Sequence, residues 1–152
     1  MPKHDYSIDV NEEECAKAMG KELHVSPKDS VEICKEIKDM YLEDAQEYLE
    51  AVVRKEKSVP YSRHDKKKAH RKGAGQDSGG YPVKAANAIL DVLENVEANA
   101  EYKGLVLENL RIIHASAKKG IEFPGIQPRA FGRATPSNRM TSNIEIVVRE
   151  EG

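Results

Sequence analysis

The chain has 152 residues, of which 33% are charged and 39% are hydrophobic, and its formal net charge is −2 at pH 7. This length suits one domain with a modest core. No apolar run approaches the roughly 20 residues that span a bilayer, and the N-terminus, MPKHDYSIDV, lacks an apolar secretory segment, so we expect a cytoplasmic protein without a membrane partner.

The small net charge conceals an uneven distribution along the chain. Residues 1 to 56 contain 8 Lys/Arg and 15 Asp/Glu, whereas residues 57 to 152 contain 16 and 11. Binding to a polyanion depends on local patches of charge rather than on the total. The distribution therefore predicts a molecule that docks onto a polyanion through one side and holds its acidic half away.

Cys15 and Cys34 are the only two cysteines. They do not form a CxxC pair, and no histidines stand at the spacing that would complete a structural zinc site. We expect two free thiols, buried or partly buried, and no metal or other cofactor.

The N-terminal part of the chain predicts a tail and a short strand. Residues 1 to 14 are polar and acidic and lack periodicity, which indicates a mobile or extended tail. Residues 15 to 25 favour a strand with a bend at Gly20. A body domain is expected to begin with this strand and to continue to residue 109.

Two helices should follow. Ser26 suits the N-cap, Pro27 the first helical position, and apolar residues then recur at helical spacing to about Asp39. A second amphipathic helix should begin near Tyr41. Its first turn is acidic, and the basic pair at residues 54 and 55 is expected in its last turn, as the helix dipole favours.

Residues 61 to 80 contain six Lys/Arg, two His and four Gly without apolar periodicity, which predicts a loop. Its basic side chains could follow phosphates, although a solvated linker is the alternative. The GxxxxGK[ST] order of a nucleotide-binding loop is absent. The candidate phosphate contacts in this loop are Arg63, His64, Lys66, Lys67, Lys68, His70, Arg71 and Lys72.

A third helix, opened by Pro82 and closed before Gly104, is the longest and most apolar of the predicted helices. We expect it at the centre of the core. Its expected inner face consists of Ala86, Ile89, Leu90, Leu93, Val96 and Ala100.

Residues 110 to 150 predict a long β-hairpin whose arms are apolar at the root and polar toward the tip, with Ile144, Ile146 and Val148 on one face of the returning arm. Between residues 111 and 139 there are six basic residues and a single acid, Glu122. A two-stranded ribbon is marginal alone in water, so a partner should order it. The charge indicates a polyanion.

The histidines allow other chemistry in principle. His64, His70 and His114 lack partners at ligand-like spacing, and no Ser or Cys stands in a nucleophile-elbow motif. Contact with phosphate or sugar is the better interpretation of His114, which lies near Arg111 on the same arm. The Arg, Ser, Thr and Asn side chains of the tip suit RNA phosphates and 2′-hydroxyls, whereas a disordered basic loop is the alternative.

Three collinear segments carry a family resemblance: MGKELHVSPKDSVEICKEI at 19 to 37, YPVKAANAILDVLENVEANAEYKGL at 81 to 105, and GRATPSNRMTSNIEIVV at 132 to 148. Together they resemble the archaeal and eukaryotic branch of the large-subunit ribosomal protein L twenty-two family. The resemblance implies an α+β fold with three helices packed on a small three-stranded antiparallel sheet and a long protruding β-hairpin. It also implies a structural, non-enzymatic constituent of the large ribosomal subunit that binds rRNA, supports assembly and lines the polypeptide exit tunnel.

By position, the resemblance extends the RNA contacts beyond the basic loop to Lys84, Arg111, His114, Lys118, Lys119, Arg129, Arg133 and Arg139. It assigns a tunnel-facing tip to Phe123, Pro124, Gly125, Ile126, Gln127 and Pro128. The implied partners are large-subunit (23S-type) rRNA, neighbouring large-subunit proteins and the nascent polypeptide. The chain departs from the family in its sparsely basic tip and its overall acidity.

Two other function classes stay open from sequence. One is a free-standing RNA-binding or chaperone-like module that uses the same basic loop. The other is a small hydrolase built on His70 or His114 with a nearby carboxylate.

Overall fold

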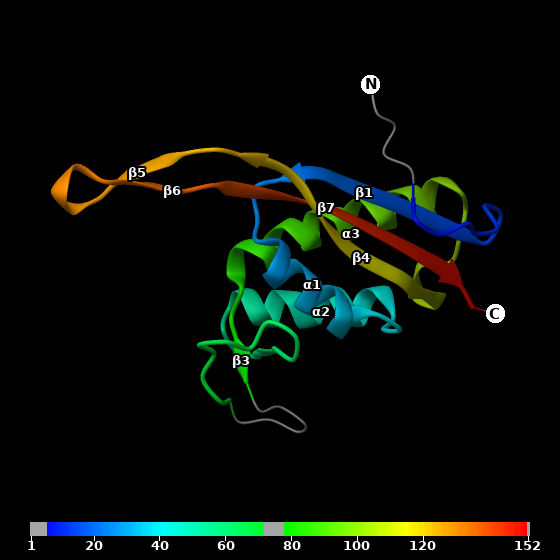
Figure 1. Cartoon of the computed structure of the whole chain (residues 1–152). Helices are drawn as coiled ribbons and strands as arrows, with labels where there is room; N and C mark the ends of the chain where they lie inside the picture. The colour runs from blue at the N-terminus through cyan, green and yellow to red at the C-terminus, as the bar shows by residue number, and fades with distance from the viewer. Residues whose placement is uncertain (1–5, 72–77, 152) are drawn as a thin grey trace.

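The structure is a computed structural model that describes residues 6–71 and 78–151. Three helices pack against one face of a three-stranded antiparallel sheet, and a long β-hairpin extends from the sheet beyond the helices (Figure 1). This arrangement confirms the expected α+β class. Within the described residues, no helix combines the length and the apolar character needed to cross a bilayer.

The main sheet consists of β1 (Cys15–Leu23), β4 (Leu110–Phe123) and β7 (Arg139–Glu150), in the order β1-β7-β4. The strand that comes last in the chain is therefore the central one. Because side chains alternate along a strand, Ile144 and Ile146 of β7 share the face that the helices cover, and both are fully buried.

Beside Gly20, where the sequence predicts a bend, a helix approaches β1 closely. The pairing of β1 with β7 shifts register between Gly20 and Leu23. A Cβ atom at Gly20 would lie 2.7 Å from Cδ1 of Leu23 and 2.9 Å from Cγ2 of Val92 in the third helix. Glycine therefore lets the helix pack directly on the strand.

The first helix, α1 (Pro27–Ile37), begins as the sequence predicts. Ser26 is the N-cap, and its hydroxyl accepts a hydrogen bond from the backbone N–H of Asp29 at 3.4 Å. The helix ends two residues before Asp39, which has a left-handed φ of 69°.

The second helix, α2 (Leu42–Val53), ends earlier than expected, so the basic pair Arg54 and Lys55 lies outside its last turn, which corrects that prediction. Lys55 adopts a left-handed φ of 60°. Backbone hydrogen bonds then run from Lys55 N–H to the carbonyl of Val52 and from Glu56 N–H to that of Ala51, the pattern of a Schellman cap.

The longest helix, α3 (Val83–Tyr102), lies at the centre of the core, as predicted, and Gly104 follows it with a φ of 77°. One expected inner residue, Leu90, is only partly buried, whereas Val92 is buried because β1 crosses it at Gly20. The buried residues of α3 are Ala85, Ala86, Ile89, Val92, Leu93, Val96 and Ala100.

Beyond the body, the hairpin continues as a thin ribbon. β5 (Ile126–Pro128) pairs with β6 (Ala134–Pro136), and the turn between them contains the short helix η2 (Ala130–Gly132). Every residue of these two short strands is exposed. The other short elements are η1 (Leu107–Asn109), which leads into β4, and the pair β2 (Val59–Pro60) and β3 (Gly79–Gly80), which closes the basic loop at its base.

The outer face of the sheet is less polar and less open than simple alternation predicts. Glu145 and Val147 are 3% and 0% exposed. The segment before β1 covers part of this face, since the backbone N–H of Ser7 donates to Glu145 at 3.1 Å. The two cysteines, Cys15 and Cys34, are free and buried as expected, and burial raises the pKa of Cys34 to about 12.

Candidate nucleic-acid interface

The basic loop is fastened to α1 by one buried carboxylate. Glu32 is 2% exposed, and its Oε1 accepts from the backbone N–H groups of Arg63 at 2.9 Å and His64 at 3.0 Å, while Oε2 accepts from Ser62 at 3.2 Å. Burial disfavours its ionisation, but these backbone donors outweigh burial and hold the pKa of Glu32 below its ordinary value. The start of the loop therefore follows a fixed course, rather than that of a free linker.

Aromatic rings position two of the loop cations. The Lys68 ammonium lies 4.4 Å from the ring centroid of Tyr61, whose hydroxyl donates to Oδ1 of Asp29 at 2.8 Å. The Arg71 guanidinium lies 5.2 Å from the ring centroid of Tyr81. Cation–π contacts of this kind restrain long side chains. Lys72, the last predicted contact of the loop, lies outside the described residues.

A groove of about 380 Å³ separates this loop from the start of α1, and we call it the loop groove. It unites several predicted contacts with one that sequence reasoning missed, Lys28. A lone lysine in a first helical turn carries no motif, so no pattern could have found it. The lining residues are Ser26, Lys28, Asp29, Tyr61, Arg63, His64, Lys66 and Lys68.

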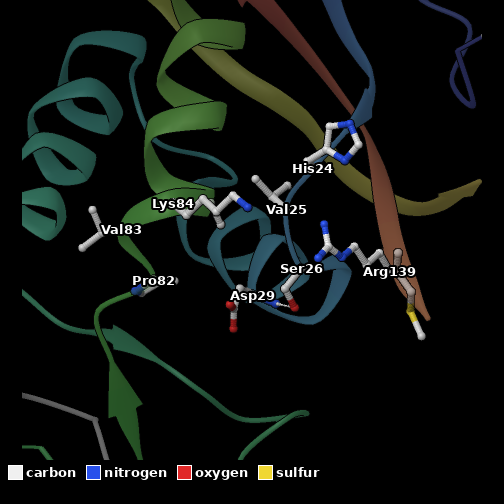
Figure 2. A pocket seen from close by; sticks show the side chains of 10 residues that line it. His24, Val25, Ser26, Asp29, Pro82, Val83, Lys84 and Arg139 are labelled. Atoms are coloured by element: carbon white, nitrogen blue, oxygen red, sulfur yellow. Dashed lines mark hydrogen bonds between the residues drawn. The ribbon is translucent and has the colours of Figure 1, made fainter. Parts of the chain in front are cut away.

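A larger groove of about 850 Å³ lies where the starts of α1, α3 and β7 converge, and we call it the root groove (Figure 2). Lys84 and Arg139 reach into it from opposite sides, and His24 stands at its edge. Lys84 and Arg139 were both predicted from the sequence, whereas His24 was not. The lining residues are His24, Val25, Ser26, Asp29, Pro82, Val83, Lys84, Ala85, Arg139 and Met140.

The predicted contacts on the inner arms already have partners within the protein. Arg111 lies over the Tyr41 ring at 4.9 Å, with its Nε 3.4 Å from Oε2 of Glu151. Lys118 lies 4.0 Å from Oε2 of the buried Glu145, and Lys119 pairs with Glu122 at 3.4 Å. These pairs reduce the positive charge that the inner arms present.

The outer hairpin is different. Arg129, Arg133 and Arg139 are exposed, and none of them takes part in a salt bridge within the described chain. Phe123, placed at the tip by sequence, lies instead at the base of the ribbon, where its ring stacks on that of His24 with centroids 6.1 Å apart. The remaining predicted tip residues, 124 to 128, lie beyond this contact.

A hydrolase site is not formed around His114. Its Nε2 lies 2.8 Å from Oε1 of Glu145 and 3.3 Å from Oγ of Ser7, so the carboxylate and the hydroxyl meet the same ring nitrogen. A catalytic relay needs them on opposite nitrogens. His70 forms a backbone bridge with Ser78, and the described residues contain no group of three or more His, Cys, Asp or Glu arranged to hold a metal ion.

The fold and this surface together define a small α+β protein whose described residues present cations without salt bridges in two grooves and along a projecting ribbon. The chain belongs to the ribosomal protein L22p/L17e family, whose model matches residues 18–149. It is similar to the large ribosomal subunit protein uL22 of Methanosphaera stadtmanae, with 53% identity over 150 residues and 97% of each chain covered.

Two further relatives share nearly their full length with it. The large ribosomal subunit protein uL22 of Methanocaldococcus jannaschii is 49% identical over 151 residues, which cover 99% of this chain and 97% of that protein. The protein of the same name from Aeropyrum pernix is 47% identical over 155 residues, with 99% of each covered. The resemblance inferred from three sequence segments is thus confirmed.

Proposed function

We propose that this chain is a structural constituent of the large ribosomal subunit, that it binds large-subunit (23S-type) rRNA and supports assembly, and that its hairpin lines the polypeptide exit tunnel. Family membership supports the ribosomal role. The observation that carries the RNA contact is a set of exposed arginines without salt bridges in the described chain: Arg129 and Arg133 on the projecting ribbon and Arg139 at its base.

The energetics of the ribbon support a partner of this kind. β5 and β6 are joined by only three residue pairs, and the ribbon there has two strands and no core of its own. An isolated two-stranded hairpin is marginal in water. Phosphates that pair with its arginines would supply the missing contacts, since Arg forks match phosphate geometry.

The tip would then meet the tunnel interior and the nascent polypeptide, while the body contacts rRNA and neighbouring large-subunit proteins. In this role the protein needs neither a cofactor nor catalytic residues, and it resides on cytoplasmic ribosomes. The exposed apolar side chains of the hairpin, Ile126 at 76% and Phe131 at 98%, are available for such contacts.

The test is sedimentation of the tagged, full-length protein through a density gradient at moderate salt. We expect it in the large-subunit fractions at the stoichiometry of the ribosome. Replacement of Arg133 and Arg139 by Ala should shift protein toward the top fractions, since a hydrogen bond to a charged group is worth about 1.5–3 kcal/mol. The matched control is Lys57→Ala, an exposed residue in the bend that follows α2, which should leave sedimentation unchanged.

Recovery of the wild-type protein only in the top fractions would contradict the proposal. If that soluble protein also bound many unrelated RNAs with similar affinity, a free-standing RNA-binding module would be the better assignment.

A further inference from the structure

The root groove and the loop groove adjoin. Ser26 and Asp29 line both of them, so the first turn of α1 is their shared wall. The combined surface runs from the first residue of β7, past α1, to the basic loop. Two sites that lie far apart in the sequence, around residue 63 and at residue 139, thereby line adjoining grooves on either side of the start of α1.

The charge of these two grooves is almost entirely positive. Among the described residues that line either groove, Asp29 is the only acid, and one of its oxygens accepts from Tyr61. None of the lining Lys and Arg residues takes part in a salt bridge within the described chain, unlike the cations of the inner arms. These residues are Lys28, Arg63, Lys66, Lys68, Lys84 and Arg139.

Part of this surface is preorganised. Glu32 fixes the backbone of Arg63 and His64, and the Tyr61 ring restrains Lys68. A site whose charged groups are held before binding loses less conformational entropy when the ligand arrives. A set of several cations, some of them restrained, suits a ligand with repeated anions more than a single small ion.

The root groove also has an aromatic end. His24 lines it, and the His24 ring stacks on Phe123 with an interplanar angle of 24°, while Phe123 is 46% exposed. Proteins that hold single-stranded nucleic acid combine a positive groove along the backbone with aromatic side chains for the bases. The two features occur together here.

We propose that the root groove and the loop groove form one track for the phosphodiester backbone of a single RNA strand, with Lys28 and His24 as contacts in addition to the basic loop and the hairpin root. The identity of the ligand as RNA rests on the proposed function. The new element is that one strand occupies both grooves, so the loop and the hairpin root contact the same segment of RNA.

The experiment uses the full-length protein and a fluorescently labelled oligouridylate of about ten nucleotides, a length within the usual site sizes for single-strand binders. Affinity is measured over a salt series. We expect one strand per protein, and each of Lys28→Ala and Arg139→Ala should reduce the slope of log K against log salt by about 0.7, the value for one lost phosphate contact on a single strand. In the double variant the slope should fall by the sum of the two reductions, about 1.4.

Lys57→Ala is the matched control and should keep the wild-type slope, and thermal melting of every variant verifies folding. Two strands per protein, or a Lys28→Ala slope equal to that of the wild type, would overturn the single track. Tighter binding of a duplex of the same length, or of polyglutamate with the same sensitivity to both variants, would overturn the assignment to one RNA strand.

The two proposals fail in different ways. If the wild-type protein sediments with large subunits but Lys28→Ala binds oligouridylate normally, the track is wrong and the ribosomal role stands. If the track behaves as expected but the protein stays in the top fractions, the ribosomal role is wrong.

Discussion

His114 of β4 and Glu145 of β7 meet on the outer face of the sheet, with Nε2 of the imidazole 2.8 Å from Oε1 of the carboxylate. Glu145 is 3% exposed and also accepts from the backbone N–H and the hydroxyl of Ser7. One carboxylate therefore holds together the two arms of the hairpin and the segment that precedes β1.

This carboxylate should make stability depend on pH. Burial disfavours its ionisation, but the hydrogen bonds from Ser7 and His114 outweigh burial and lower the pKa of Glu145. A group with a lowered folded-state pKa stabilises the protein above its unfolded-state pKa, and that contribution is lost as pH falls through the folded-state value. Glu145→Gln should therefore reduce the free energy of unfolding by about 1.5–3 kcal/mol at neutral pH, and by less at acid pH.

Urea denaturation of the wild type and the variant measures the two free energies of unfolding. It is carried out at neutral pH and below about pH 4, which is near the ordinary pKa of a Glu side chain. Glu101→Gln, at an exposed position of α3, is the control and should be neutral at both. A Glu145→Gln effect of the same size at both pH values would contradict the assignment.

Leu93 should be among the costliest core residues to truncate. It is fully buried on α3, so Leu93→Ala should lower the free energy of unfolding by about 2–5 kcal/mol. Leu90, one turn earlier and only partly buried, provides a matched substitution with a smaller expected cost. Equal losses for the two variants in thermal or urea unfolding would contradict the packing described for α3.

The thiol of Cys34 should be unreactive in the folded protein. With its pKa raised to about 12 by burial, almost no thiolate exists at neutral pH, and the thiolate is the nucleophile. Alkylation by iodoacetamide, followed by mass spectrometry of a Cys15→Ser variant, should be slow in buffer and fast in urea. Rapid alkylation without denaturant would show that the site opens.

The rate of amide hydrogen exchange along the hairpin should change near Lys119. Up to the pair Lys119 and Ser142, β7 lies between two strands, because β1 pairs with it as far as Leu23. Beyond that point only two strands remain. In the free protein we expect slow exchange before this boundary and fast exchange at residues 124 to 138, with protection of the latter in the assembled subunit. Strong protection of residues 124 to 138 in the free protein would contradict it.

The sequence alone does not locate this change from three strands to two. The start of α1 and the end of α3 followed from local signals, Ser26 before Pro27 and Gly104 after α3, because caps are set by neighbouring residues, whereas the end of α2 did not. The burial of Glu145 could not be predicted in this way. The alternation of side chains along β7 carries no information about Ser7, which covers Glu145 from 138 residues away in the sequence.

The binding surface divides in the same way. The basic loop and the arginines of the hairpin are visible as runs of charge in the sequence, and their contacts with RNA remain predictions. Lys28 and His24 are isolated residues whose importance arises only when two distant segments meet at the start of α1. The anchoring role of Glu32 was hidden for the same reason, because its partners lie 30 to 32 residues further along.

The order β1-β7-β4 has a consequence for biosynthesis. β1 and all three helices precede, in the chain, the strand that joins the two edges of the sheet. Until β7 has been synthesised, β1 and β4 lack the strand that pairs with both of them, and the three-stranded sheet cannot form. The sheet therefore closes only after β7 has been made, and until then neither edge strand has the neighbour that it pairs with.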